Sequence, residues 1–515
     1  MAAPFAFDHR AEFLPESSDD LLRSIPAAPG VFALRGADPT AEPYLTRAAD
    51  LRRRLRRLLD PPEALDENGQ PLPSKRLNLR ARIRWIEWTR TGSDFESTLL
   101  LYRAARSAFG PDEARRRLRL HAPYVLRITM SQPHPRVYST NRLSKKSLGE
   151  SFGPFPSRAA AERYGDAVLD LFLLRRCYED LEPYPEHPGC VYGEMNKCMQ
   201  PCKEGNPQAC TPEQYAHEAE RVFAFFTTRG QSLLDEVAAR REAASEAMDF
   251  EGAATLHKQW EKVHAASLLA DELVRPIDQL RALILQPATP LEDEPRPEAA
   301  AVFLFEHGQL CGSERLSTLG VRAVREQTAV GSSLFAQPLM LAPIPLDEPT
   351  PIHIAQTNPV ILSEGAGQPT APQLEDPEAS SPTQTAPGFS TLTPEDRARA
   401  AIDVLAMHTE SAPDMAEFCD HLSLLRRWYY RPDKQRAGEV FLPSPDSTWP
   451  IRRILNGAAR VALGPPAPVS PADREAAKAL KTKIIHAGRE GVEREVPILP
   501  KRSRTRKAVT PDDLL

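Results

Sequence analysis

Four cysteines gathered in a short stretch constrain the fold of this chain more than any other feature. They are Cys177, Cys190, Cys198 and Cys202, in the spacing C-x12-C-x7-C-x3-C. The chain of 515 residues has only seven cysteines, so this grouping is not what composition alone would produce. Grouped thiolates bind soft metals, either as a tetrahedral zinc site or as an iron–sulfur cluster. Disulfides are disfavoured because the first residues do not read as a secretory signal and cytosolic thiols stay reduced.

The overall composition is that of an ordinary globular protein. The chain is 41% hydrophobic and 26% charged with a net charge of −5, so nothing global indicates a nucleic-acid partner. No apolar run approaches the ~18–20 residues of a membrane span, so we expect no membrane contact and a cytoplasmic location. The 51 prolines are the outlier, and polar, proline-rich segments cannot offset their ordering entropy by burial. We therefore expect disorder over about 365–392 and in a basic tail after about 488.

The residues around the cysteines resemble the UvrC family of bacterial excinuclease proteins. Residues 151–157 read SFGPFPS, the run that ends at Cys177 reads LFLLRRC, and the run that ends at Cys202 reads CVYGEMNKCMQPC. The family has FGPYPS-like, LFPLRTC-like and CLLYQIKRCSAPC-like segments in the same order, and only the first cysteine gap is longer here by one residue. Its four cysteines hold a [4Fe–4S] cluster. The resemblance therefore implies an iron–sulfur cluster, with zinc as the alternative, and leaves Cys210 as a plain cysteine.

The amino-terminal part resembles the GIY-YIG nuclease domain that opens the same family. Residues 30–34 and 44–47 read as strands, and residues 50–59 read as a helix with leucines on one face and arginines on the other. A solvated face is one interpretation of such a charge run, and contact with DNA phosphates is the other. The predicted DNA-binding residues are Arg47, Arg52, Arg53, Arg54, Arg56 and Arg57.

Carried over residue by residue, the resemblance implies a nuclease site that has lost two of its parts. GIY-YIG enzymes combine a metal-holding glutamate, a proton-relaying tyrosine and an arginine that steadies the phosphate. Tyr44 and Arg54 match the family, whereas Phe32 replaces the relaying tyrosine, Tyr102 replaces the glutamate and Ala114 replaces an asparagine. A neutral phenol offers no carboxylate to a hard cation. We therefore expect an inactive nuclease, with Mg²⁺ needed only if a nearby carboxylate has taken over.

Residues 213–268 read as helix throughout, with apolar residues at three- and four-residue steps. The run ASEAMDFEGAA that begins at Ala244 resembles the UVR motif, through which UvrC and its excinuclease partner UvrB bind each other. The resemblance implies a UvrB-like partner, and the alternative is a hairpin that packs only internally. The predicted partner-binding residues are Phe250, Glu251, Ala254 and Trp260.

The expected fold class is multidomain α+β. It comprises a small GIY-YIG-like α/β domain, a helical Cys-cluster domain, a UVR-like helical hairpin, and a small β-containing domain with a disordered Pro-rich insertion. Residues 299–323 read as two strands around a His-Gly turn, and residues 418–443 resemble a later family segment. We find no match to the family's RNase H-like or helix–hairpin–helix domains, so we expect a truncated member. The predicted segments are 1–24 (N-terminal extension), 25–118 (GIY-YIG-like), 119–212 (Cys cluster), 213–268 (helices with the hairpin), 275–345 (β-rich linker domain), 346–415 (Pro-rich, partly disordered insertion), 416–487 (helical/β) and 488–515 (basic disordered tail).

Two functions of different classes follow from these features. The first is a DNA-binding protein of nucleotide excision repair that lacks nuclease activity and docks on UvrB. The second is an active, short GIY-YIG endonuclease that makes a single incision near a lesion. A zinc-stapled binding protein unrelated to repair is a more distant third. A carboxylate at the metal position of the folded domain would separate the first two.

Overall fold

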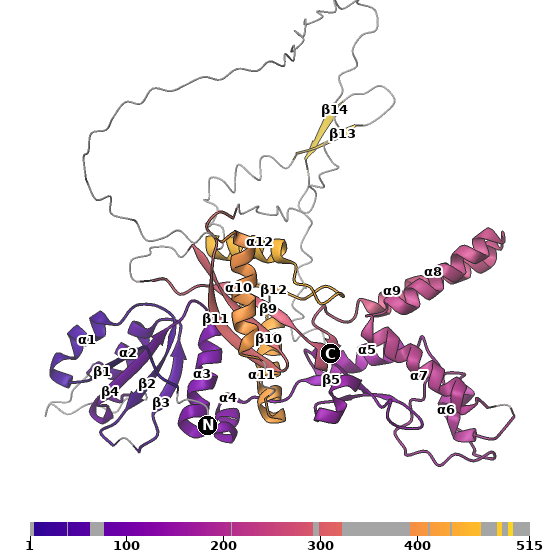
Figure 1. The fold of residues 1–515 in the computed structure, drawn as a ribbon, viewed down its shortest axis with the longest axis horizontal. Helices are drawn as coiled ribbons and strands as arrows, with labels where there is room; N and C mark the ends of the chain where they lie inside the picture. The colour runs from indigo at the N-terminus through magenta and orange to yellow at the C-terminus, as the bar shows by residue number, and fades with distance from the viewer. Residues whose placement is uncertain are drawn as a thin grey trace, which may run out of the picture. The chain divides into compact units, whose positions relative to one another are not determined.

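The computed structural model describes the chain in ten stretches. They are residues 5–38, 40–61, 77–207, 209–291, 298–321, 392–409, 413–432, 435–464, 482–486 and 493–497. The insertion predicted at about 365–392 and most of the predicted tail lie outside these stretches. Helices and strands both recur from one end of the described chain to the other (Figure 1). The structure is therefore mixed helix and sheet, which confirms the α+β class that the sequence predicts.

A four-stranded antiparallel sheet lies in the amino-terminal part. Its order is β1 (His9–Glu12), β4 (Trp85–Arg90), β2 (Gly30–Arg35) and β3 (Tyr44–Ala48). The helices and 3-10 turns of this part are η1 (Pro15–Ser17), α1 (Ser18–Ser24), α2 (Leu51–Leu59), η2 (Arg80–Arg82), α3 (Asp94–Phe109) and α4 (Pro111–Leu118). The two strands and the helix predicted between residues 30 and 59 are confirmed.

Helix α2 forms where its local sequence signals agree. The Asp50 side chain caps the helix by accepting a hydrogen bond from the backbone N–H of Arg53. The apolar positions recur at helical spacing, so one face of the helix is apolar and packs into the hydrophobic cluster of this part. The buried residues of that face are Leu51, Leu55, Leu58 and Leu59. The arginines consequently lie on the other face.

The described part of the predicted N-terminal extension 1–24, which begins at residue 5, is not separate from the domain that follows, contrary to the prediction. Strand β1 pairs with β4, and Phe13 and Leu22 are buried in the same cluster as Phe32. These apolar residues stand in a polar, acidic stretch, so they give no periodic signal in the sequence. Their burial against the sheet nevertheless stabilises the pairing of the edge strand. The described part of this domain therefore includes β1 and α1.

The middle part combines a second antiparallel sheet with a helical region. The sheet order is β6 (Val137–Thr140), β5 (Tyr124–Ile128), β7 (Ser151–Phe155) and β8 (Arg275–Pro276). The helices and 3-10 turns are η3 (Lys145–Glu150), α5 (Arg158–Leu169), α6 (Val191–Glu194), η4 (Pro201–Lys203), α7 (Pro212–Thr227), α8 (Gln231–Glu246) and α9 (Phe250–Ser267). The helical prediction for 213–268 is confirmed, and the chain divides there into three helices.

A third antiparallel sheet has helices packed against both faces. Its order is β11 (Gln309–Ser317), β10 (Ala299–Glu306), β9 (Ala282–Pro287) and β12 (Glu439–Phe441). The helices and the 3-10 turn of this part are η5 (Ile277–Gln279), α10 (Pro394–Met407), α11 (Met415–Tyr429) and α12 (Ile451–Leu463). The two strands predicted in 299–323 are confirmed, with His307 and Gly308 in the turn between them.

Strand β10 is buried along its whole length because it has a hydrophobic cluster on each face. Phe303 and Phe305 pack in one cluster with residues of α3 and α11. Val302 and Leu304 pack in the other with residues of α10 and α12. Successive side chains of a strand point to opposite faces, so a run of apolar residues satisfies both clusters. This strand therefore joins the amino-terminal helix α3 to the carboxy-terminal helices.

The predicted boundaries around the insertion are wrong in two respects. The segments 275–345 and 416–487 form one sheet, because β12 pairs with β9 from Leu283 to Leu285. Helix α10 lies inside the predicted insertion 346–415, yet Ala398, Ile402 and Leu405 are buried in the core. The proline-rich composition of the wider segment obscured this short amphipathic helix.

The predicted tail is also wrong for one short segment. Strand β14 (Glu493–Pro497) falls inside the segment 488–515 that is predicted as a disordered tail, and it pairs with β13 (Thr482–His486), which lies just before that segment. The basic composition indicates disorder, but a β-branched residue such as Val496 favours a strand. Separately, none of the helices in the described stretches has both the length and the apolar character that crossing a membrane requires.

Candidate functional site

The four predicted metal-binding cysteines lie in a loop-rich segment of the middle part. Cys177 follows α5, Cys190 directly precedes α6, Cys198 lies in the turn after α6, and Cys202 lies in η4. All four are free thiols, and Cys198 and Cys202 are buried. Four soft donors of one type form a donor set that suits zinc or an iron–sulfur cluster. The chemistry of the donors therefore fits the metal centre that the sequence predicts.

The pKa values of the two buried thiols, Cys198 and Cys202, are raised. Burial is the main cause that raises the pKa of Cys198 to about 12, and the charges of Cys190, Cys177 and Cys202 raise it further. Burial likewise raises the pKa of Cys202, with contributions from Cys190 and Cys177. Metal binding replaces the thiol protons and so relieves this cost. Within the described stretches, no group of three or more His, Cys, Asp or Glu side chains is arranged to hold a metal ion as it stands.

Hydrogen bonds hold the loop that carries Cys198 and Cys202. The backbone N–H of Gln200 donates to Cys198 Sγ at 3.3 Å, and Gln200 has a positive φ of 58° that folds the turn. The backbone N–H of Tyr184 donates to the Cys202 carbonyl at 3.1 Å. The loop is therefore ordered by its own backbone contacts.

Cys210 is a half-buried cysteine beside this segment. It packs against the hydrophobic cluster of the middle part, and burial is the main cause that raises its pKa. Cys202 contributes to the same shift, so the two thiols are neighbours. Its packing agrees with the interpretation of Cys210 as a plain cysteine.

Three of the residues carried over from the nuclease family lie together on β2, β3 and α2. The guanidinium of Arg54 donates to the Tyr44 hydroxyl at 3.3 Å. The ring of Phe32 is buried, and its centroid lies 6.4 Å from that of Tyr44. The structure therefore brings these three side chains together, with an apolar ring at the position where the family has a tyrosine.

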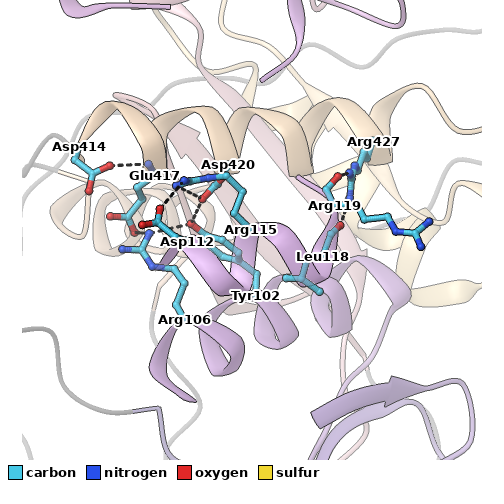
Figure 2. Close-up of polar contacts among 10 residues, drawn as sticks. All are labelled: Tyr102, Arg106, Asp112, Arg115, Leu118, Arg119, Asp414, Glu417, Asp420 and Arg427. Carbon is cyan, nitrogen blue, oxygen red and sulfur yellow. Dashed lines mark hydrogen bonds and ion pairs between the residues drawn. The ribbon is translucent and has the colours of Figure 1, made fainter. Parts of the chain in front are cut away.

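Tyr102, which is predicted to stand at the position of the family's metal glutamate, has a different environment. It is 1% exposed and belongs to the hydrophobic cluster of α11 and β10, whereas Phe32 belongs to the cluster of the first sheet. Its hydroxyl donates to Asp420 Oδ2 at 3.2 Å and accepts from Arg106 Nη1 at 2.9 Å (Figure 2). Tyr102 therefore ties α3 to α11, and the structure does not place it in the cluster that holds Phe32.

An arginine–aspartate pair joins α4 to α11 next to this contact. The Arg115 guanidinium donates from Nε to Asp420 Oδ1 at 2.8 Å and from Nη2 to Oδ2 at 3.1 Å (Figure 2). The Asp420 side chain is 2% exposed, so Arg115 and Tyr102 supply the partners that a buried carboxylate requires. Ala114, the last of the carried-over positions, is buried on α4 beside Arg115.

Glu96, the nearest preceding glutamate on α3, is occupied by structural contacts. Its carboxylate accepts from the backbone N–H of Gly92 at 2.7 Å and from the Ser313 hydroxyl at 2.7 Å. The residue is buried where α3 meets β11. These contacts give Glu96 a structural role in joining the first part to the third sheet.

The predicted DNA-binding arginines of α2 differ in their environments. Arg53 and Arg57 are exposed, whereas Arg52 donates to the Ile25 carbonyl at 2.7 Å and Arg54 contacts Tyr44. Arg52, Arg53, Arg56 and Arg57 line one open hollow together with Asp50 and Asp60. Arg47 lies apart from them and pairs with Asp94 at the start of α3. The exposed arginines of α2 therefore form one basic surface.

Helices α8 and α9 form the predicted hairpin, which is buried only at its base. Val237 and Val263 belong to the hydrophobic cluster of the middle part. At the tip, Asp249 caps α9 by accepting from the Gly252 N–H at 2.9 Å, and Phe250 is 68% exposed. Of the other predicted partner-binding residues, Glu251 and Ala254 are exposed and Trp260 is half-buried. The hairpin therefore presents an aromatic side chain to solvent at its tip.

Sequence reasoning missed two groups that the structure reveals. Asp420 lies on α11 close to the buried Phe418 and Leu422, and a buried carboxylate among apolar residues signals a cationic partner elsewhere in the chain. Arg175 stands two residues before Cys177 in the run LFLLRRC and is 3% exposed. Each of these two residues can be recognised in the sequence as a charged residue next to apolar residues. The residue that it contacts cannot be recognised from the sequence.

Comparison with known proteins identifies the middle part. Residues 124–225 match the family model of the UvrC/Cho excinuclease middle domain, and this stretch contains all four clustered cysteines. No solved structure matches the chain.

Three curated relatives are UvrABC system protein C from different bacteria. The protein of Actinobacillus succinogenes is 30% identical over 249 residues, which cover 48% of this chain and 38% of the relative. That of Aliivibrio salmonicida is 25% identical over 327 residues, which cover 63% of this chain and 49% of the relative. That of Saccharophagus degradans is 28% identical over 242 residues, which cover 47% of this chain and 37% of the relative. The chain thus spans less than half the length of these relatives. Over the matched part it is similar to UvrC, and residues 124–225 match the UvrC/Cho middle domain.

Proposed function

We propose that this chain acts in nucleotide excision repair as a DNA-binding protein that docks on UvrB and does not cut DNA. The match of residues 124–225 to the UvrC/Cho middle domain carries the proposal, and the similarity to UvrABC system protein C of other bacteria supports it. The contacts of the arginine-rich helix, of Tyr102 and of the helical hairpin support its separate parts.

The four clustered cysteines would hold a [4Fe–4S] cluster, with zinc as the alternative. Bound through four thiolates, such a centre would tie together the loop between α5 and α7, which has only short helices of its own. Cys177 and Cys190 would bind the centre from the first part of this loop, and Cys198 and Cys202 would bind it from the second part. Brown protein with iron and acid-labile sulfide after anaerobic purification would support this centre, and colourless protein with stoichiometric zinc would contradict it.

DNA binding would depend on the basic surface of α2. Arg53 and Arg57 are exposed on this surface, so their guanidinium groups can reach phosphate oxygens. Such contacts carry no sequence information by themselves, so the binding should be largely independent of sequence.

The lack of cleavage would follow from two positions of the nuclease-like domain. Phe32 has no hydroxyl to relay a proton, and Tyr102 is engaged with Asp420 and Arg106 in the tie to α11. A general base typically contributes about 10²–10⁴-fold, and a metal adds charge stabilisation beyond that. Arg54 and Tyr44 would then serve to bind phosphate.

Docking would use the tip of the α8–α9 hairpin. Phe250 is a large apolar side chain exposed to solvent, and aromatic residues of this kind commonly anchor protein interfaces. A hairpin of similar sequence in UvrB is the expected partner, because the resemblance to the UVR motif implies pairing of such hairpins.

The direct test is assembly on damaged duplex DNA with purified UvrA and UvrB. We expect the chain to shift the UvrB–DNA complex on a native gel, and to lose that shift when Phe250 is changed to Ala. Binding to DNA without any effect of UvrB would contradict the docking part. If the chain binds neither DNA nor UvrB, the result would contradict the proposal as a whole.

A further inference from the structure

A buried arginine lies directly beside the first of the clustered thiols. Arg175 is 3% exposed, and its guanidinium donates from Nε to the His134 carbonyl at 3.0 Å and from Nη1 to the Glu179 carbonyl at 2.9 Å. The same Nη1 lies 3.6 Å from Cys177 Sγ as a donor. Its backbone N–H donates to the Tyr215 hydroxyl at 3.1 Å, which fixes the chain at this point. The guanidinium cation of Arg175 thus points toward the thiol of Cys177.

The charge of Arg175 has no carboxylate to balance it among the described residues, where its partners are carbonyl oxygens and a sulfur. Its neighbour Arg176 differs, because it pairs with Asp170 at 2.8 Å. Glu204, a carboxylate of the same loop, is 45% exposed and faces His134 at 3.7 Å. Burying a cation without a counter-charge is costly, so this position favours an anion beside it.

We propose that Arg175 is the positioning residue and counter-charge of a metal–thiolate centre held by Cys177, Cys190, Cys198 and Cys202. Four cysteines that bind a metal do so as thiolates, and the bound centre carries net negative charge. The N–H of Arg175 donates to the sulfur of Cys177 and stabilises that charge. This inference rests on the metal site of the proposed function, and it holds for a zinc centre as well as for an iron–sulfur cluster.

Loss of Arg175 should have one measurable consequence for an iron–sulfur cluster and a different one for a zinc centre. Hydrogen bonds and charges near the sulfurs are among the factors that set the reduction potential of an iron–sulfur centre. Reduction adds negative charge, so a neighbouring cation favours the reduced form and raises the potential. Loss of Arg175 should therefore make the midpoint potential more negative. For zinc, the same loss should weaken retention of the metal.

The experiment compares three variants of the full chain, each purified without oxygen. Arg175→Gln removes the charge, Arg175→Lys keeps the charge but lacks the forked N–H groups, and Arg176→Gln is the matched control whose charge Asp170 already balances. Iron, sulfide and zinc are measured in each, followed by an optical redox titration. For Arg175→Gln we expect at least a tenfold shift of the reduction equilibrium toward the oxidised form, which is about 59 mV for one electron. Arg175→Lys should shift in the same direction by less, and Arg176→Gln should match the wild type.

Several results would overturn the inference. An Arg175→Gln protein with the potential and metal content of the wild type would do so, as would an equal shift in Arg176→Gln. If Arg175→Gln does not fold, Arg175→Lys decides, and a potential unchanged from wild type counts against the inference. If the wild type holds zinc only, the proposed cluster fails, and Arg175 is then tested by competition with a chelator. There we expect at least tenfold weaker zinc retention in Arg175→Gln, and equal retention would refute its role. Wild-type protein with neither metal would refute both the cluster and the inference.

Discussion

Tyr102 and Asp420 form a structural contact at the position where the resemblance to GIY-YIG nucleases predicts a metal ligand. The tyrosine packs edge-to-face with His421 at a centroid distance of 5.4 Å, and its hydroxyl bonds to both Asp420 and Arg106. From the sequence, Tyr102 could be recognised as a departure from the family. Its partner could not, because Asp420 is 318 residues further along the chain. Tyr102 thus joins two helices, α3 and α11, that are distant in sequence.

Substitution of Tyr102 by Glu should destabilise the protein without giving it nuclease activity. The shorter side chain would leave the ring's space partly empty and place a carboxylate beside buried Asp420. Losses of this kind cost ~2 kcal/mol or more. We expect a lower urea midpoint for Tyr102→Glu, whereas Tyr102→Phe, which loses only the hydroxyl, should cost about 1 kcal/mol. A Tyr102→Glu protein as stable as the wild type would show that the tie is unimportant.

His421 should make the stability depend on pH. Burial, together with the nearby charge of Arg103, lowers its pKa from 6.5 to about 3 in the folded protein. Below pH 6.5 the unfolded chain therefore binds a proton that the folded chain rejects, and stability falls as the pH falls toward 3. The linkage amounts to about 2 kcal/mol between pH 7 and pH 5. Urea unfolding at these two pH values should show this loss, and His421→Asn, which keeps an acceptor for the Leu310 N–H, should show less of it. Equal losses in the two proteins would assign the pH dependence to other groups.

At the scale of elements, the spacing of apolar residues in the sequence predicts those helices and strands whose stability depends on that spacing. The helix α2 and the strands β10 and β11 could be predicted because their apolar positions and turn residues repeat at the right spacing. In the β10–β11 turn, His307 and Gly308 both have positive φ, which suits a tight hairpin. The pairing of β9 with β12 could not be predicted, since a strand of three residues has no period and its partner is more than 150 residues away.

The basic surface of α2 should control the salt dependence of DNA binding. Changing both Arg53 and Arg57 to Ala should reduce the slope of log affinity against log salt by about 1.8, because each phosphate contact contributes about 0.9. The matched control is the double change to Lys, which keeps both charges and should keep the slope. Fluorescence anisotropy with a short duplex measures both. An unchanged slope in the Ala variant would place the DNA contact elsewhere.

The hairpin tip should determine binding to UvrB. Phe250→Ala removes the exposed aromatic side chain, and an anchor of this kind is worth ~2 kcal/mol or more when buried by a partner. We therefore expect at least tenfold weaker binding in a pull-down or titration. Leu268→Ala is the control, because Leu268 is as exposed as Phe250 but lies just beyond the other end of α9. If both changes have the same effect, or neither has one, the tip is not the docking site.

On the scale of the whole molecule, contacts between segments distant in sequence hold the first part to the third. Helices α3 and α4 contact α11 through Tyr102, Arg106 and Arg115 (Figure 2). The middle domain could be recognised from the sequence through its resemblance to the UvrC family, and the match over residues 124–225 confirms it. The merging of the last two predicted domains into one sheet could not, because it depends on pairing across the insertion.

Incision of damaged DNA is the measurement that tests the central claim most directly. A duplex with a single lesion is incubated with UvrA, UvrB, this chain, and magnesium or manganese, and the strands are separated on a denaturing gel. We expect no incision above background, because Phe32 supplies no proton relay and Tyr102 supplies no metal carboxylate. A metal-dependent nick made by the unmodified chain and abolished by Arg54→Ala would contradict this and show that the chain is a nuclease.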